Sequence, residues 1–535
     1  MNDGMSHGVN GTNTTGGLNR ADGTARRYHA AVWDEPLIME QGAPGRRGTV
    51  PPGPMEGAGG GDPLPAGVRR TTPPDLPEAA EPDVLRHYLR LSQQTMGMVG
   101  ISLFGTCTMK YNPRVNELLA ARDQVAEVHP HQDDGSIQGL LEIVHRFDLM
   151  LRELSGMGRF VFQAGGGAAA AYLHACVTRA YHESRGELAQ RRDVITTAQA
   201  HPCNPATAAA AGFNVITLPV ERDGHPSLEA LRAVVSDRTA SLMINNPDDM
   251  GIYNPHIKQW VDIVHEAGGL CFYDHANFNG VMGRIKAAEL GFDACMFMLH
   301  KTFGVPKGGG GPAVGAYGCT PELERFLPGP LVVQTDSGYE RRENPEGIGR
   351  VREFLGNLPQ VVKAYSWLLA MGADGIREAA DISVLANNYM EARLLAVPGV
   401  TKSFDHLTLR RLEMTRFSLG EYTEQTGVTA VDVQNRMTDF GVDAFWLSHE
   451  PWIVPEPFTP EAGEGWSLED IDYWIDVLAY VMEEGRTSPA MVKSAPHNQV
   501  VAQIDGSSLD DPSRWATTWR AYQRKNAQRA NAAGR

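Results

Sequence analysis

Basic residues, cysteines and long apolar runs are all scarce in this sequence of 535 residues. Its 48 lysines and arginines are outnumbered by 64 aspartates and glutamates, and the net charge is −16. A nucleic-acid groove needs clustered basic side chains, so we expect no nucleic-acid partner. No apolar run approaches the length of a membrane-spanning helix, so we expect no membrane partner.

The six cysteines are scattered along the chain without a C-x-x-C pair. This pattern argues against a disulfide framework and predicts reduced thiols, no metal site and a cytoplasmic protein. Cys107 and Cys203 have two interpretations: redox-sensitive thiols if exposed near a ligand, or buried inert thiols, which are the commoner case. The N-terminus lacks an apolar core segment and is therefore not a secretory signal.

The composition that is present, 42% hydrophobic and 21% charged, is typical of a soluble globular enzyme. Polar, glycine-rich residues 1–30 should form a disordered tail, and residues 31–98 an extended arm that ends in a helix. We expect a large α/β domain over 99–370 and a smaller α+β domain over 371–505. Residues 506–535 form a polar tail.

Short apolar strands alternate with amphipathic helices through the large domain. The expected strands are 161–163, 193–197, 215–218, 240–244, 270–273 and 294–299. This rhythm predicts a mostly parallel sheet covered by helices on both faces. In such a sheet, ligands bind outside the carboxyl ends of the strands.

An acid and a lysine stand at two of these strand ends. Asp274 follows the strand at 270–273, and Lys301 follows the one at 294–299. Pyridoxal phosphate (PLP) takes a lysine that forms a Schiff base and an acidic partner for its ring nitrogen. The alternative is a structural aspartate and a surface lysine in an ordinary α/β domain.

The glycines at 165–167 lie between the strand at 161–163 and the start of a helix. A glycine turn before a helix N-terminus offers backbone N–H groups and the helix dipole to an anion such as a phosphate. The alternative is that glycine only permits tight packing, because the spacing matches no nucleotide-binding fingerprint.

Polar residues also follow two further strands, at His201 and at Asn246. With Asp274 and Lys301 they predict four strand ends that converge on one rim. The loop 104–113 contains Thr108, Lys110 and Asn112 and either forms a turn or lines a ligand site.

At this level of detail the sequence resembles the C-terminal half of the glycine cleavage P-protein, the glycine dehydrogenase (decarboxylating) subunit 2 family. The similarity runs from about Trp33 to about Ile504. Its landmarks are Pro44 to Gly48, Cys107 to Pro113, Arg179 to Gly186, Leu299 to Phe303, Gly308 to Pro312, Ile348 to Val351 and Ala495 to His497.

The resemblance implies a fold-type I PLP enzyme and a role for each strand-end residue. Lys301 would be the Schiff-base lysine, Asp274 the partner of the pyridinium nitrogen, and His201 would lie over the ring. The implied cofactor contacts also include Gly166, Gly167 and Ala168 at the phosphate, Asn246 near the phenolic oxygen, and His300 and Thr302 beside the lysine. Thr108, Lys110 and Asn112 are expected to contact substrate.

In the family reaction, glycine loses CO₂ and its aminomethyl group passes to the lipoyl arm of the carrier H-protein. The resemblance therefore implies glycine as the favoured substrate and the lipoyl H-protein as a partner. It also implies a homodimer, or a heterotetramer with a subunit 1 chain.

This sequence departs from the family near the expected site. Ala169 and Ala171 replace a polar residue and a glutamate, Cys203 lies in an altered His-Pro-Cys-Asn-Pro segment, and Lys307 replaces a histidine. His275 replaces a glycine beside Asp274; it is either a catalytic acid/base or a space-filling group that hydrogen-bonds the neighbouring loop.

These departures leave a second function open, a stand-alone or repurposed PLP enzyme for another amino acid or amine. A third, a non-catalytic regulatory half, is opposed by the retention of Lys301 and Asp274.

Overall fold

The computed structural model describes residues 35–48, 65–72, 74–94, 101–103, 110–222, 224–306, 311–443, 447–448, 452–499, 503, 506 and 509–533. The predicted tail at 1–30 lies outside them. The chain divides into one unit made of Met1–Gly100 with Ser494–Arg535 and a second made of Ile101–Lys493. The five predicted regions remain predictions.

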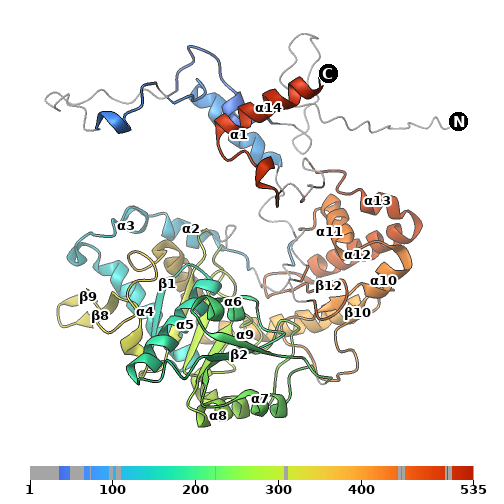
Figure 1. The fold of residues 1–535 in the computed structure, drawn as a ribbon. Coiled ribbons are helices and arrows are strands. Elements are labelled where there is room, and N and C mark those ends of the chain that lie inside the picture. Colours follow the sequence, from blue (N-terminus) through green and yellow to red (C-terminus); the bar gives the residue numbers. More distant parts are fainter. Residues whose placement is uncertain are drawn as a thin grey trace. The chain divides into compact units, whose positions relative to one another are not determined.

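The first unit contains described segments from the N-terminal and the C-terminal part of the sequence. The predicted helix of the N-terminal arm is α1 (Glu81–Gln94), and the same unit contains α14 (Trp519–Ala533) near the other end of the sequence (Figure 1). Tyr522 of α14 donates a hydrogen bond to Glu40 Oε1 at 3.0 Å. The side chain of Glu35 is fully buried and accepts hydrogen bonds within this unit, which anchors the arm to α1.

The second unit is built on a seven-stranded sheet of order β1-β7-β6-β5-β4-β2-β3 (Figure 1). Its strands are β1 (Arg159–Ala164), β2 (Asp193–Thr197), β3 (Asn214–Leu218), β4 (Thr239–Asn245), β5 (Leu270–His275), β6 (Ala294–Met298) and β7 (Gly315–Cys319). Strands β3, β2, β4, β5 and β6 pair in parallel, whereas β7 is antiparallel to both β6 and β1. The predicted mostly parallel sheet is confirmed.

Helices cover both faces of this sheet. One face packs against α4 (Gln138–Ser155), α7 (Leu228–Val234), α8 (Ile257–Glu266) and the first part of α9 (Leu358–Leu394). The other packs against α5 (Gly167–Ser184) and α6 (Cys203–Ala210). Because strand side chains alternate, Phe272 of β5 lies in the α5 core and Tyr273 in the opposite core.

The C-terminal part of this unit has its own apolar core around Trp474. It contains a three-stranded sheet of β10 (Thr401–Lys402), β11 (Phe417–Ser418) and β12 (Pro457–Phe458). Its helices are α10 (Gly420–Thr426), α11 (Ala430–Met437), α12 (Leu468–Thr487) and α13 (Pro489–Lys493). Helix α9 connects both parts and breaks at Gly372, whose φ of 62° and ψ of −178° favour glycine.

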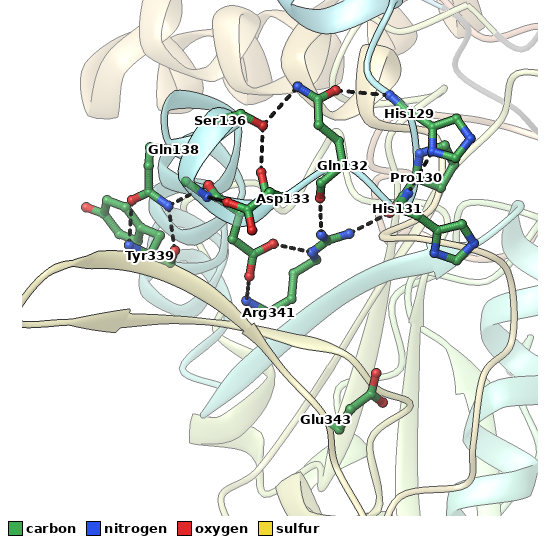
Figure 2. A network of polar contacts seen from close by, with 12 residues as sticks. His129, Pro130, His131, Gln132, Asp133, Ser136, Gln138, Tyr339, Arg341 and Glu343 are labelled. Atoms are coloured by element: carbon green, nitrogen blue, oxygen red, sulfur yellow. Dashed lines mark hydrogen bonds and ion pairs between the residues drawn. The ribbon is translucent and has the colours of Figure 1, made fainter.

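Sequence reading missed several elements of this unit. They include the sheet strand β7, the helices α2 (Arg114–Ala120) and α3 (Asp123–Ala126), and the hairpin of β8 (Leu331–Thr335) and β9 (Gly338–Arg342). Figure 2 shows how Arg341 joins the hairpin to the loop before α4, since its guanidinium donates to the carbonyls of Pro130 and Gln132 and to the Asp134 carboxylate. Among the described residues, no helix is both long and apolar enough to cross a membrane.

Candidate functional site

Asp274 lies near the carboxyl end of β5 and is 1% exposed. Its Oδ1 accepts a hydrogen bond from the Ala276 N–H at 2.9 Å, and its Oδ2 accepts one from Asn204 Nδ2 at 3.1 Å. Burial raises the pKa of this carboxyl to about 6, although Lys301 and these hydrogen bonds oppose the rise. One hydrogen bond to each oxygen thus fixes the orientation of the carboxyl group. Because burial penalises its negative charge, a nearby cation stabilises the carboxylate.

Lys301 follows the neighbouring strand, β6, and is 4% exposed. Strands β5 and β6 pair in parallel with Asp274 opposite Met296, so their carboxyl ends lie side by side. The Lys301 N–H donates to the Met298 carbonyl at 3.1 Å, which turns the chain directly after the strand. The charge of Lys301 lowers the pKa of Asp274, so the two side chains are electrostatically coupled.

The predicted glycine turn follows β1 and starts the 18-residue helix α5. Gly166 is the N-cap with φ 148° and ψ −170°, a conformation that favours glycine. A Cβ on Gly167 would lie 2.9 Å from the sulfur of Met298, and one on Gly165 would lie 2.9 Å from Arg352 Nη1. The turn therefore packs against β6, the strand that leads to Lys301. The guanidinium of Arg352 lies beside Gly165, the first glycine of the turn.

His201 precedes α6 and accepts a hydrogen bond at Nδ1 from the Cys203 N–H at 3.1 Å. A ring nitrogen that accepts carries no proton, so neutral His201 bears its proton on Nε2. Burial and the nearby Asp274 raise the pKa of the Cys203 thiol. Cys203 is therefore a thiol rather than a thiolate, which favours the inert interpretation; Cys107 lies outside the described residues.

Asn246 directly follows β4, whose last residue, Asn245, pairs with Asp274. The Asn246 side chain accepts from the Asn254 N–H at 2.8 Å and donates to the Asn254 carbonyl at 3.4 Å, so both of its polar atoms hold the loop 246–254. The contact of Asn246 with a cofactor oxygen stays a prediction, because its amide nitrogen keeps a second N–H to donate.

His275 points to the opposite face of β5 from Asp274 because neighbouring strand residues alternate. Its ring stacks on Tyr273 at a centroid distance of 3.8 Å and on Phe297 at 5.2 Å. Burial lowers its pKa to about 3, and neither ring nitrogen has a hydrogen-bond partner among the described residues. The predicted loop hydrogen bond is therefore not found among them, and an acid/base role has no geometric support.

The remaining predicted residues are the two neighbours of Lys301 and the three residues of the loop 104–113. His300 and Thr302 are buried beside Lys301. Lys110 forms a buried ion pair with Glu464 at 2.9 Å and lies 4.7 Å from the Trp367 ring centroid. Asn112 donates to Glu117, which also pairs with Lys363, so it supports α2. Thr108 lies outside the described residues.

Three side chains near this site were not selected from the sequence. Asn204, which holds Asp274, is part of the altered segment after His201, and that position was its only sequence signal. Arg416 is 2% exposed, donates from Nε to Thr459 Oγ1 at 3.3 Å, and has no hydrogen-bond partner for Nη2 among the described residues. Glu413 is 1% exposed. A buried arginine and glutamate leave no local sequence pattern.

The described residues fit PLP. Each Asp274 oxygen accepts one hydrogen bond and retains acceptor capacity for a ring N–H. The buried Lys301 supplies the amine. The turn supplies the first N–H groups of a long helix, which have no partner within the helix and can donate to a phosphate. Met298 and Arg352 lie so close to Gly167 and Gly165 that no side chain fits at either position.

Comparison with known proteins gives a consistent result. The class-V aminotransferase family model matches residues 158–434. The probable glycine dehydrogenase (decarboxylating) subunit 2 of Pyrococcus abyssi is 41% identical over 92% of this chain and 98% of that protein. The protein of the same description from Caldanaerobacter subterraneus is 38% identical over 88% of this chain and 96% of its own.

Two solved structures share the fold. The inhibitor-bound glycine decarboxylase (P-protein) of the glycine cleavage system matches with a TM-score of 0.66 and 23% identity, over 78% of this chain and 93% of that chain. A NifS-like protein matches with a TM-score of 0.56 and 17% identity, over 72% of this chain and all of that chain. The predicted fold-type I architecture is confirmed.

Proposed function

This chain belongs to the glycine dehydrogenase (decarboxylating) subunit 2 family, and on that premise we propose that it decarboxylates glycine as the PLP-bearing subunit of a glycine cleavage system. The observation that carries the proposal is the pairing of a buried lysine with a buried, oriented carboxyl on adjacent parallel strands. A structural aspartate and a surface lysine would not both be buried there.

The cofactor is PLP, as in the class-V aminotransferase family. When bound, it supplies an electron sink for the bond that breaks at the substrate α-carbon. Lys301 would hold it covalently, and Asp274 would accept the hydrogen bond of its ring nitrogen and keep that nitrogen protonated. The N–H groups of the turn before α5 would hold its phosphate.

The chain's other residues position these groups. Asn204 and the Ala276 N–H fix the two oxygens of Asp274, so the carboxyl cannot rotate away from the ring. His201 is held at Nδ1 by the Cys203 N–H, which directs its N–H at Nε2 away from that contact. Each arrangement is made before substrate arrives, which is the form of preorganisation that catalysis requires.

Arg416 is our candidate for the substrate carboxylate. Burial lowers the pKa of its guanidinium, and the charges of Asp249 and Asp248 oppose that change. A guanidinium donates charge-assisted hydrogen bonds to a carboxylate, and Nη2 has no partner among the described residues. Fixing the carboxylate orients the bond that breaks.

The acceptor and the partners are the finer part of the proposal. We propose that the aminomethyl group passes to a lipoyl carrier protein and that a subunit 1 chain completes the enzyme, in a homodimer-based or heterotetrameric assembly. We place the protein in the cytoplasm, in keeping with the free cysteines at 176, 203, 271, 295 and 319.

The test is glycine-dependent exchange of labelled CO₂ by the PLP-loaded chain, with and without a subunit 1 chain and a lipoyl carrier. We expect exchange that requires the partners, is abolished by Lys301→Ala, and survives Lys363→Ala, which removes another buried lysine. The absorbance band of the bound PLP gives a second measurement. If glycine leaves this band unchanged while another amine shifts it, the enzyme acts on that amine and the glycine proposal fails.

A further inference from the structure

Three side chains of types that bind metals meet at the amino ends of the central strands, at the opposite end of the sheet from Asp274 and Lys301. His265 is on the last turn of α8, Cys271 is the second residue of β5, and Asp293 directly precedes β6. A ring nitrogen of His265, the Cys271 sulfur and a carboxylate oxygen of Asp293 all lie within 4.8 Å of one another. Because the three residues come from different elements, no short sequence motif marks them.

The Asp293 carboxylate connects the other two residues. Its Oδ2 lies 2.8 Å from His265 Nε2 and accepts a hydrogen bond from the Cys271 N–H at 2.7 Å. The Cys271 side chain is fully buried, and its sulfur lies 3.9 Å from the Val261 carbonyl oxygen of α8. The side chains of His265 and Asp293 are 37% and 17% exposed, so the cluster is open to solvent on the side of these two groups.

The spacing of the three donor atoms suits a tetrahedral zinc ion. Zinc binds nitrogen and oxygen at about 2.0 to 2.2 Å and thiolate sulfur at about 2.3 Å, which places the donors of a tetrahedral site about 3.4 to 3.6 Å apart. The distance of 2.8 Å between His265 Nε2 and Asp293 Oδ2 is shorter than this, and no pair of donors exceeds 4.8 Å. Side-chain shifts of about 1 Å are therefore enough to place all three donors around one ion.

The charges around the cluster favour a cation. The hydrogen bond with Asp293 raises the pKa of His265. Burial raises the pKa of the Cys271 thiol well above its usual range, and the negative charges of Asp293 and Asp262 raise it further. The cluster also lies at the C-terminal end of α8, where the helix dipole is negative. A divalent cation bound to the sulfur would offset these negative charges and stabilise the thiolate.

We propose that His265, Cys271 and Asp293 bind one zinc ion, with water as the fourth ligand. On binding, the Cys271 S–H bond breaks, a zinc–sulfur bond forms, and the thiol proton passes to solvent together with any proton on the binding nitrogen of His265. The thiolate and the carboxylate balance the charge of the ion, and all three ligand types are ones that zinc accepts. The ion would join α8 to the starts of β5 and β6. Because this site lies far along the strands from Lys301, the inference does not depend on the proposed function.

The test uses the full-length, PLP-loaded chain, which is freed of metal with a chelator and then dialysed against zinc. We expect one zinc ion per chain to remain after gel filtration. The melting temperature should rise by about 3 °C at a hundredfold excess of zinc over the dissociation constant. Cys271→Ser keeps the size of the side chain but supplies no thiolate, and the zinc affinity should fall by about a hundredfold or more. Cys319→Ser, which changes another fully buried cysteine of the sheet, is the control and should bind zinc like wild type.

His265→Asn provides a second variant if Cys271→Ser does not fold, because the His265 side chain is partly exposed. It should also lose about a hundredfold in zinc affinity, whereas His131→Asn, which changes an exposed histidine outside the cluster, should lose none. Cadmium, a thiophilic stand-in for zinc, should give a thiolate charge-transfer band in wild type that Cys271→Ser removes. No retained zinc in wild type would overturn the proposal. Equal zinc affinity in wild type and in either folded cluster variant would also overturn it, because the zinc would then be an adventitious ion only.

Discussion

The two faces of β5 offer a ligand very different surroundings, although Asp274 and His275 are neighbours in the chain. Asp274 faces the α5 and α6 side, where an amide and a backbone N–H bind its oxygens. His275 faces aromatic rings and has no hydrogen-bond partner for either nitrogen among the described residues. Strand alternation therefore decides which of two adjacent polar residues can serve a cofactor.

The same comparison distinguishes two buried carboxyls at the carboxyl end of the sheet. Burial raises both pKa values, to about 6 for Asp274 and about 7 for Glu413. Asp274 has two well-formed hydrogen bonds that support its charge, whereas Glu413 has none of good geometry among the described residues. Asp274 is therefore suited to remain a carboxylate beside a cation, and Glu413 to change its protonation state.

The largest effect should come from Asp274→Asn, which removes the carboxylate from the polar face of β5. The amide has the same shape but cannot carry the negative charge that keeps the ring nitrogen protonated. We expect glycine decarboxylation to fall by about a hundredfold or more, with the fold intact by circular dichroism. Asp262→Asn, a surface change on α8, is the control and should retain activity. Activity within a fewfold of wild type would show that Asp274 has no such role.

Glu413→Gln should change stability in a pH-dependent way. The folded-state pKa of about 7 lies above the ordinary glutamate value of 4.5, so the stability that the protonated carboxyl contributes is complete below about pH 4.5. That contribution is lost as the pH rises through 7, because folding then requires a buried charge. Glutamine titrates nowhere, so the variant should gain on the order of 3 kcal/mol relative to wild type between pH 5 and 8.

Chemical denaturation at both pH values measures this difference, and Glu391→Gln should show much less of it. A stability difference between wild type and Glu413→Gln that does not change with pH would contradict the raised pKa of Glu413.

His275→Phe should have the smallest effect. It replaces a buried ring without hydrogen-bond partners among the described residues by an apolar ring in an aromatic environment. We expect activity within about twofold of wild type. The free energy of unfolding should be equal or higher by about 1 kcal/mol, because a buried polar group is removed. A tenfold loss of activity without a loss of stability would restore His275 as a catalytic candidate.

Sequence reasoning found the parallel sheet because apolar strands alternate with amphipathic helices along the chain. It found the residues at the strand ends because they directly follow the apolar runs. It placed Asp274, Lys301 and the glycine turn correctly relative to the strands. It could not tell that Asn246 binds Asn254, since that contact depends on how a loop folds back. Asn204, Glu413 and Arg416 come from other segments and meet the site only through tertiary packing.

Reduction with borohydride followed by peptide mass spectrometry tests the central claim most directly. The reagent fixes PLP to the amine that holds it, without any need for substrate or partner chains. We predict a pyridoxyl group on the peptide that contains Lys301 and none on peptides that contain Lys110 or Lys363. A label on another lysine, or no label after incubation with PLP, would contradict the assignment of this site.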